Sequence, residues 1–131
     1  MGCDNKDKNC FDRDIKGEFK EEMGFTPPGI MVAQKLGMDM QELLSDYHHL
    51  IWRDDVIPLK YKYLIALASA IFDDHQERTM LELKKAVKNG ANRDEVLEVL
   101  RQVVWLKGAP TLVKLAPVIK YLDKHLPEES D

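Results

Sequence analysis

The sequence predicts an all-α protein built as a compact bundle of about six helices. Apolar residues recur at three-and-four spacing through most of the chain, which is the pattern of helices that bury one face. Glycines and prolines separate these stretches, and no stretch alternates apolar and polar residues as a half-buried strand does. The 131 residues, 44% of them hydrophobic, suffice for one core but not for two ordinary domains.

The expected organisation is a polar leader with a short helix over residues 1–23, followed by a helical domain over residues 24–131. Both cysteines, Cys3 and Cys10, lie in the leader. Their spacing is not Cys-x-x-Cys and no histidine is near them. This pattern favours two exposed, reduced thiols, with a redox or metal-binding pair as the alternative.

Three short helices are predicted in the first part of the chain. The first lies within residues 13–23 and ends before Gly24, and the second spans residues 30–36 and is closed by Gly37. Asp39 is expected to cap the third helix. The apolar positions of the third helix repeat at helical spacing, at Leu43, Leu44, Tyr47, Leu50 and Ile51.

A fourth helix is expected to be capped by Asp55 or a neighbour, with Pro58 in its first turn. It is apolar nearly all round over residues 63–72, so other protein surface must cover most of its sides. A fifth helix follows the polar segment 73–78 and continues to Lys88. Its buried stripe is predicted from Met80, Leu81, Leu83 and Val87.

Clear start and stop signals follow the fifth helix. Asn89-Gly90 ends it, and Asn92 with Glu95 forms a capping box that starts the sixth helix. The last helix starts at Pro110. Pro117 lies inside that helix, so a kink or a restart is expected there, because proline removes a backbone hydrogen bond.

Charge and hydropathy exclude several classes of function. The formal net charge is −4, with both signs mixed along the chain, so no basic stripe indicates a nucleic-acid partner. No apolar run approaches the roughly 18 residues that a membrane span needs. The N-terminus lacks the apolar segment of a signal peptide, and a cytoplasmic protein is therefore expected.

Four short segments occur in an order and spacing that resemble a known family. They are Leu59-Lys60-x-x-x-Leu-Ile-Ala-Leu-Ala68, Lys85-Ala86-x-x-Asn-Gly90-Ala91, Arg93-Asp94-Glu95-Val96 and Gly108-Ala109-Pro110. In these segments the chain resembles the carboxymuconolactone decarboxylase family, which includes the alkylhydroperoxidase D-like proteins. The resemblance covers about residues 24–125. It implies a compact helical fold that assembles as a homotrimer or homohexamer.

The resemblance also marks four positions of functional interest. The redox branch of the family carries a Cys-x-x-Cys, a His four residues later and a Glu twelve residues before the first Cys. These positions hold His75, Arg78, Glu82 and Tyr63 here, so the resemblance implies a peroxidase-family member without the Cys-x-x-Cys and without its thiol chemistry. The decarboxylase branch also lacks the cysteines, although it usually keeps a His at the position of Glu82.

The four residues are of types that suit acid/base catalysis. His75, Arg78 and Glu82 would share one face of a helix, and Tyr63 of the neighbouring apolar helix would face them. The imidazole moves protons near neutrality, and the carboxylate orients it or acts as a base. Arg78 would bind a substrate carboxylate, and Tyr63 would donate to a developing oxyanion. The alternative is an ion-pair network with Arg78–Glu82 as an ordinary helical pair.

The sequence leaves three functions open. The first is an oligomeric binding protein or acid/base enzyme, of decarboxylase or lactone type, for a small carboxylated or carbonyl compound. The second is a non-catalytic oligomeric binding module, and the third is an antioxidant alkylhydroperoxidase role that would need Cys3 or Cys10. No cofactor and no metal site is expected. His48 and His49 are adjacent on a helix, where side chains diverge by about 100°, which favours a surface pair over metal ligands.

Overall fold

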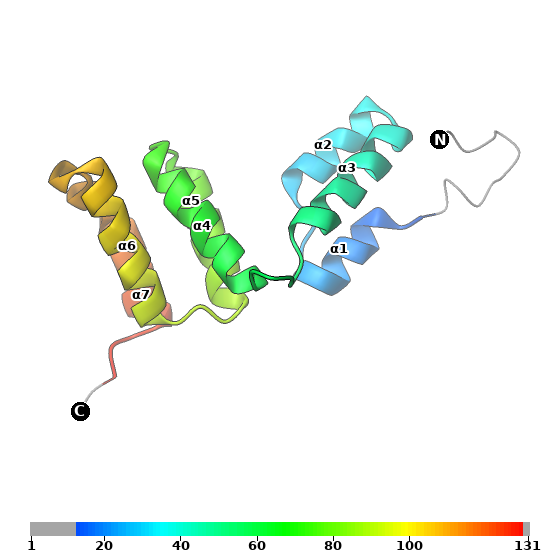
Figure 1. Cartoon of the computed structure of the whole chain (residues 1–131). Helices are drawn as coiled ribbons and strands as arrows, with labels where there is room; N and C mark the ends of the chain where they lie inside the picture. The colour runs from blue at the N-terminus through cyan, green and yellow to red at the C-terminus, as the bar shows by residue number, and fades with distance from the viewer. Residues whose placement is uncertain (1–12, 130–131) are drawn as a thin grey trace, which may run out of the picture. The chain divides into compact units, whose positions relative to one another are not determined.

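The computed structural model describes residues 13–129, and Cys3 and Cys10 therefore lie outside the described residues. All regular elements in this range are helical, which confirms the all-α prediction (Figure 1). None of these helices has the length and apolar character that a membrane crossing requires. The elements are α1 (Ile15–Met23), α2 (Pro28–Leu36), α3 (Met38–Ile51), α4 (Leu59–Phe72), α5 (Gln76–Lys88), α6 (Arg93–Lys107), the 3₁₀ helix η2 (Ala109–Leu115) and α7 (Ala116–His125).

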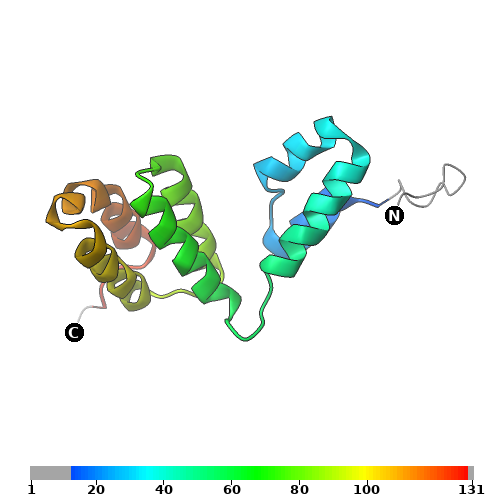
Figure 2. The same ribbon diagram turned by 45° about the horizontal axis from the view of Figure 1, so that its top comes forward.

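The chain divides into two compact units, residues 1–53 and 54–131. The first unit contains α1, α2 and α3, and the second contains the remaining helices. Residues 52–58 join them without a helix (Figure 2). The predicted organisation divided the chain after residue 23 instead, but α1 packs with α2 and α3 in the first unit.

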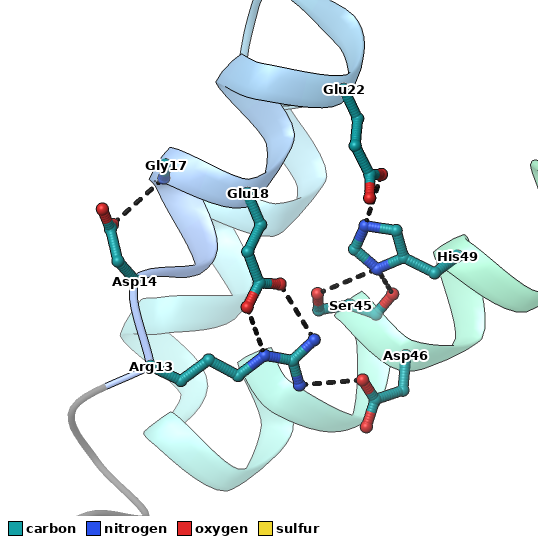
Figure 3. Close-up of polar contacts among 8 residues, drawn as sticks. All are labelled: Arg13, Asp14, Gly17, Glu18, Glu22, Ser45, Asp46 and His49. Carbon is teal, nitrogen blue, oxygen red and sulfur yellow. Dashed lines mark hydrogen bonds and ion pairs between the residues drawn. The ribbon is translucent and has the colours of Figure 1, made fainter.

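Side-chain contacts join α1 to α3 in the first unit. Phe19 is fully buried, and the ring of His49 stacks on it with 4.8 Å between ring centroids. Nε2 of His49 lies 2.8 Å from the Glu22 carboxylate, and Arg13 joins Glu18 to Asp46 at 2.8 Å from each (Figure 3). His49 thus joins two helices through its ring.

The start and the buried face of α3 differ from the sequence prediction. The helix begins at Met38, because Gly37 adopts a positive φ of 130° that turns the chain into it. Asp39 is not the capping residue, since its carboxylate accepts from the neighbouring Met40 N–H. The buried residues of α3 are the polar Gln41 and Ser45. Four of the five periodic apolar residues are exposed: Leu43, Tyr47, Leu50 and Ile51.

An antiparallel pair of helices, α4 and α5, forms the centre of the second unit (Figure 1). The capping residue of α4 is Pro58 rather than Asp55 or a neighbour, and Pro58 precedes the helix instead of lying in its first turn. The carboxylate of Asp54 nevertheless accepts from the Leu59 N–H at 2.7 Å. Leu67 and Leu83 are fully buried between the helices. As expected of a segment that is apolar nearly all round, six of the ten residues at 63–72 in α4 are buried, although Ile65 is 59% exposed.

The buried face of α5 is more polar than predicted. Of the four apolar residues expected to form its stripe, Leu83 alone is buried, and Met80, Leu81 and Val87 are partly buried. The buried residues of α5 are Thr79, Glu82, Leu83 and Ala86. The face that α5 turns to its neighbours therefore includes a carboxylate beside apolar side chains.

The remaining elements match the sequence signals closely. The predicted capping box between Asn92 and Glu95 is present in full at the start of α6. Glu95 also pairs with Lys60 of α4 at 3.0 Å, which ties α6 to α4. After Gly108 the chain forms η2 and then α7, which has Pro117 in its first turn. The helix therefore restarts at this proline, as predicted.

Candidate active site

Two of the four predicted site residues, Tyr63 and Glu82, belong to the buried surface of the α4–α5 pair. Tyr63 is on α4 and is 2% exposed, and Glu82 is on α5 and is 6% exposed. Burial, and to a lesser degree the charge of Glu82, raises the pKa of Tyr63 to about 12. The phenol therefore keeps its proton at neutral pH and can donate a hydrogen bond.

Lys85 completes this group, although it was not among the predicted site residues. It follows Glu82 by three positions on α5, and its Nζ lies 3.6 Å from Oε1 of Glu82. The same Nζ is 5.9 Å from the centre of the Tyr63 ring. The side chains of Lys85 and Glu82 are 11% and 8% exposed, so this ion pair is largely shielded from water. We refer to Tyr63, Glu82 and Lys85 as the buried cluster.

The second oxygen of the Glu82 carboxylate has no hydrogen-bond partner among the described residues. Oε2 is buried and makes no hydrogen bond with any part of the chain that the structure describes. Buried polar atoms in native proteins are almost always hydrogen-bonded, because an unpaired one costs about 1–3 kcal/mol. An unpaired carboxylate oxygen beside a phenol and an ammonium group can accept a proton or a hydrogen bond from a bound molecule.

His75 lies outside the buried cluster and has a structural role in this arrangement. It was predicted to lie within the helix, but α5 begins at Gln76, and His75 is the capping residue with an extended backbone. Its Nδ1 accepts from the Arg78 N–H at 3.1 Å, and its carbonyl accepts from the Thr79 hydroxyl at 2.9 Å. Because Nδ1 is an acceptor, the ring carries its proton on Nε2. The side chain is exposed to solvent.

Arg78 pairs with Asp73 rather than with Glu82. Its Nη1 lies 3.5 Å from Oδ2 of Asp73, and the two side chains are 42% and 66% exposed. The sequence had suggested Arg78–Glu82 as a helical pair, but the cation beside Glu82 is Lys85. Arg78 is therefore a partly exposed cation one helical turn from the buried carboxylate.

The turn between α4 and α5 is anchored by Asp74. This residue has a positive φ of 57°, and its carboxylate accepts from Lys107 at 2.8 Å and Lys114 at 2.7 Å. These two lysines, Lys107 first, hold the pKa of Asp74 below its usual value. Lys107 also donates to the carbonyl of Phe72 at the end of α4. These contacts hold the turn that leads from α4 into α5.

The chemistry available to the buried cluster is proton transfer and oxyanion binding. Residues 13–129 contain no cysteine, so no thiol can act among them. In the same range, no three His, Cys, Asp or Glu side chains lie close enough to hold a metal ion. The signal that could have found Lys85 is its position three residues after a candidate buried carboxylate, on the same side of the helix.

Comparisons with known proteins address the family and the fold. The family model of the carboxymuconolactone decarboxylase family matches residues 38–121, which is more than half of the chain. A crystal structure from Burkholderia xenovorans LB400, provisionally described as a carboxymuconolactone decarboxylase, superposes with a TM-score of 0.62. It is 19% identical over 73% of this chain and 75% of its own, which shows a similar fold. No curated protein matches the chain significantly.

The raised pKa of Tyr63 predicts a late phenol ionisation that Tyr63→Phe removes. The folded state holds this proton to about pH 12, against 10.0 for the unshifted group, so its contribution to stability is complete below pH 10.0 and is lost as the pH rises towards 12. Glu82→Gln removes the smaller cause and lowers this pKa, while burial keeps it above 10.0. Ultraviolet absorbance of tyrosinate measures both effects, and a late phase that persists in Tyr63→Phe would contradict the assignment.

Loss of Lys85 is predicted to leave the Glu82 charge uncompensated. Lys85→Met lowers the free energy of unfolding by about 3 kcal/mol, because a buried carboxylate loses its counter-charge. Lys84→Met, at the exposed neighbouring position, changes it by less than about 0.5 kcal/mol. In a Glu82→Gln background the cost of Lys85→Met is smaller, as denaturant titration would show. Equal costs in the two backgrounds would mean that Lys85 does not stabilise the carboxylate.

Proposed function

The chain belongs to the carboxymuconolactone decarboxylase family, and from this premise we propose that it is an oligomeric enzyme that performs acid/base chemistry on a small carboxylated or carbonyl compound. The proposal rests on one observation. The Glu82 carboxylate is buried, one of its oxygens has no hydrogen-bond partner in residues 13–129, and it lies beside a phenol that stays protonated at neutral pH. Lactone and decarboxylation chemistry needs these two groups, a proton carrier and a donor to a developing oxyanion.

In the proposed decarboxylation, the bond between a substrate carbon and its carboxylate breaks and CO₂ leaves. The electron pair of that bond passes into the adjacent carbonyl and forms an enolate. Tyr63 donates a hydrogen bond to the enolate oxygen. The Glu82 carboxylate takes up a proton from water by way of His75 and passes it to the substrate carbon, which returns Glu82 to its charged form. Arg78 binds a second carboxylate of the substrate.

The positions of Arg78 and His75 support these roles. Arg78 and Glu82 are four residues apart on α5, so they lie on the same side of the helix. The guanidinium is partly exposed, so a substrate carboxylate can displace the weak pair with Asp73. The exposed Nε2 of His75 is left for proton exchange, because Nδ1 is engaged by the backbone.

A non-catalytic binding module is the second candidate. The observation in its favour is that His75 and Arg78 already have partners, one as a helix cap and the other in an ion pair. In such a module these residues stabilise α5, and the buried cluster contributes only a polar contact to a ligand.

Turnover of a carboxylated γ-lactone by the full-length chain separates these candidates. We expect CO₂ release that falls by about 100-fold or more in Glu82→Gln, since a positioned acid or base contributes at least this much. Glu77→Gln is the matched control, because Glu77 is an exposed carboxylate in the first turn of α5. Binding without turnover supports the module, and turnover that is equal in Glu82→Gln and wild type excludes the proposed mechanism.

CO₂ release and peroxide consumption by a cysteine-free variant test the alkylhydroperoxidase alternative. The double variant Cys3→Ser/Cys10→Ser is expected to release CO₂ at the wild-type rate, because the proposed chemistry uses no sulfur. Peroxide consumption by the wild type that disappears in the double variant would favour the thiol role instead.

We also propose that the protein acts as a homotrimer or homohexamer in the cytoplasm. Large apolar side chains of the second unit support association, since Ile65 is 59%, Phe72 48% and Trp105 84% exposed. Sedimentation equilibrium of the full chain is predicted to give the mass of three or six chains. A single-chain mass at micromolar concentration would exclude both assemblies.

A further inference from the structure

An apolar groove with one cationic side chain lies in the second unit, between α6, η2 and α7. Its volume is about 420 Å³, within the range of about 300–1,000 Å³ that small-molecule sites occupy. Six of its lining side chains are aliphatic, and they are Leu97, Leu100, Val104, Leu112, Leu115 and Ile119. None of them belongs to α4 or α5, so the groove is separate from the buried cluster.

The groove has a deep part and an open edge. Leu100 and Leu115 are 4% and 5% exposed and form its floor. Leu112 is 57% exposed and forms part of the rim. An apolar chain placed in the groove would cover part of this aliphatic surface, which is favourable in proportion to the apolar area buried.

The remaining lining residue is Arg101, the one charged side chain of the groove. The arginines Arg13, Arg78 and Arg93 each pair with a carboxylate. Arg101 has no ion pair or hydrogen bond of its side chain among residues 13–129, and it is exposed. A guanidinium in this setting is free to bind a carboxylate in a two-pronged hydrogen bond.

We propose that this groove binds a small amphipathic carboxylate, a molecule with an unbranched apolar chain and one carboxylate head. The chain lies over Leu100 and Leu115, and the head pairs with Arg101. The volume of the groove and its single cationic side chain favour such a ligand, because small-molecule sites have this size and a guanidinium pairs with a carboxylate. This site goes beyond the proposed function, since it uses none of the groups of the buried cluster.

Calorimetric titration of the full-length chain with octanoate, 1-octanol and octylammonium tests the proposal. We expect octanoate to saturate one site per chain and to bind about tenfold more tightly than the other two, which lack the anionic head. Arg101→Gln reduces octanoate affinity to that of 1-octanol and leaves 1-octanol binding unchanged. Leu112→Ser, at the exposed rim, weakens octanoate and 1-octanol alike.

Two control variants fix the location of the ligand. Lys84→Gln removes an exposed helical cation outside the groove, and Glu82→Gln alters the buried cluster; both are expected to bind octanoate as the wild type does. Octanoate that fails to saturate the wild type, or that binds Arg101→Gln equally well, overturns the proposal. Loss of octanoate binding in Glu82→Gln also overturns it, because the ligand would then occupy the buried cluster. Light scattering that shows an oligomer dissociating in Arg101→Gln or Leu112→Ser overturns it as well, because the groove would then be a contact between copies of the chain.

Discussion

The second unit depends on a carboxylate that is almost completely withdrawn from water. Burying a charged group is costly, and it is tolerated when a counter-charge and hydrogen-bond partners are provided. Lys85 provides the charge at 3.6 Å from Glu82, and the buried phenol of Tyr63 lies under the same ammonium group. Among residues 13–129, one oxygen of this carboxylate nevertheless has no hydrogen-bond partner. Because leaving such an oxygen unpaired costs free energy, the buried cluster is the place where we expect chemistry.

The surrounding helices hold this carboxylate in place. Asp74, in a left-handed conformation, receives two lysine ammonium groups and closes the turn between α4 and α5. His75 then caps the first turn of α5 and so determines where the helix begins, upstream of Glu82. In the thiol branch of the family, the positions of His75 and Arg78 are cysteines. In this chain His75 caps the start of a helix and Arg78 binds a neighbouring carboxylate, and the buried Glu82 lies one to two turns further along.

The order of helices could be predicted from the sequence because local signals decide it. The Asn92–Glu95 capping box and the restart at Pro117 follow from side chains within a few residues of each break. The buried face of α5 could not be predicted this way. Apolar periodicity assigns charged residues to solvent, but Glu82 is buried and Lys85 lies beside it. Which side of a helix faces its neighbours is settled by packing between helices, and that depends on residues distant in sequence.

The most direct test of this account is whether the Glu82 carboxylate meets a bound molecule. Side-chain carboxyl ¹³C resonances report this, with Glu82→Gln and Glu77→Gln identifying the two signals. When a carboxylated γ-lactone is added, we expect the Glu82 resonance to shift and that of the exposed Glu77 to stay unchanged. A lactone that binds the protein while the Glu82 resonance stays unchanged would show that the buried cluster is a structural ion pair and that the ligand site lies elsewhere.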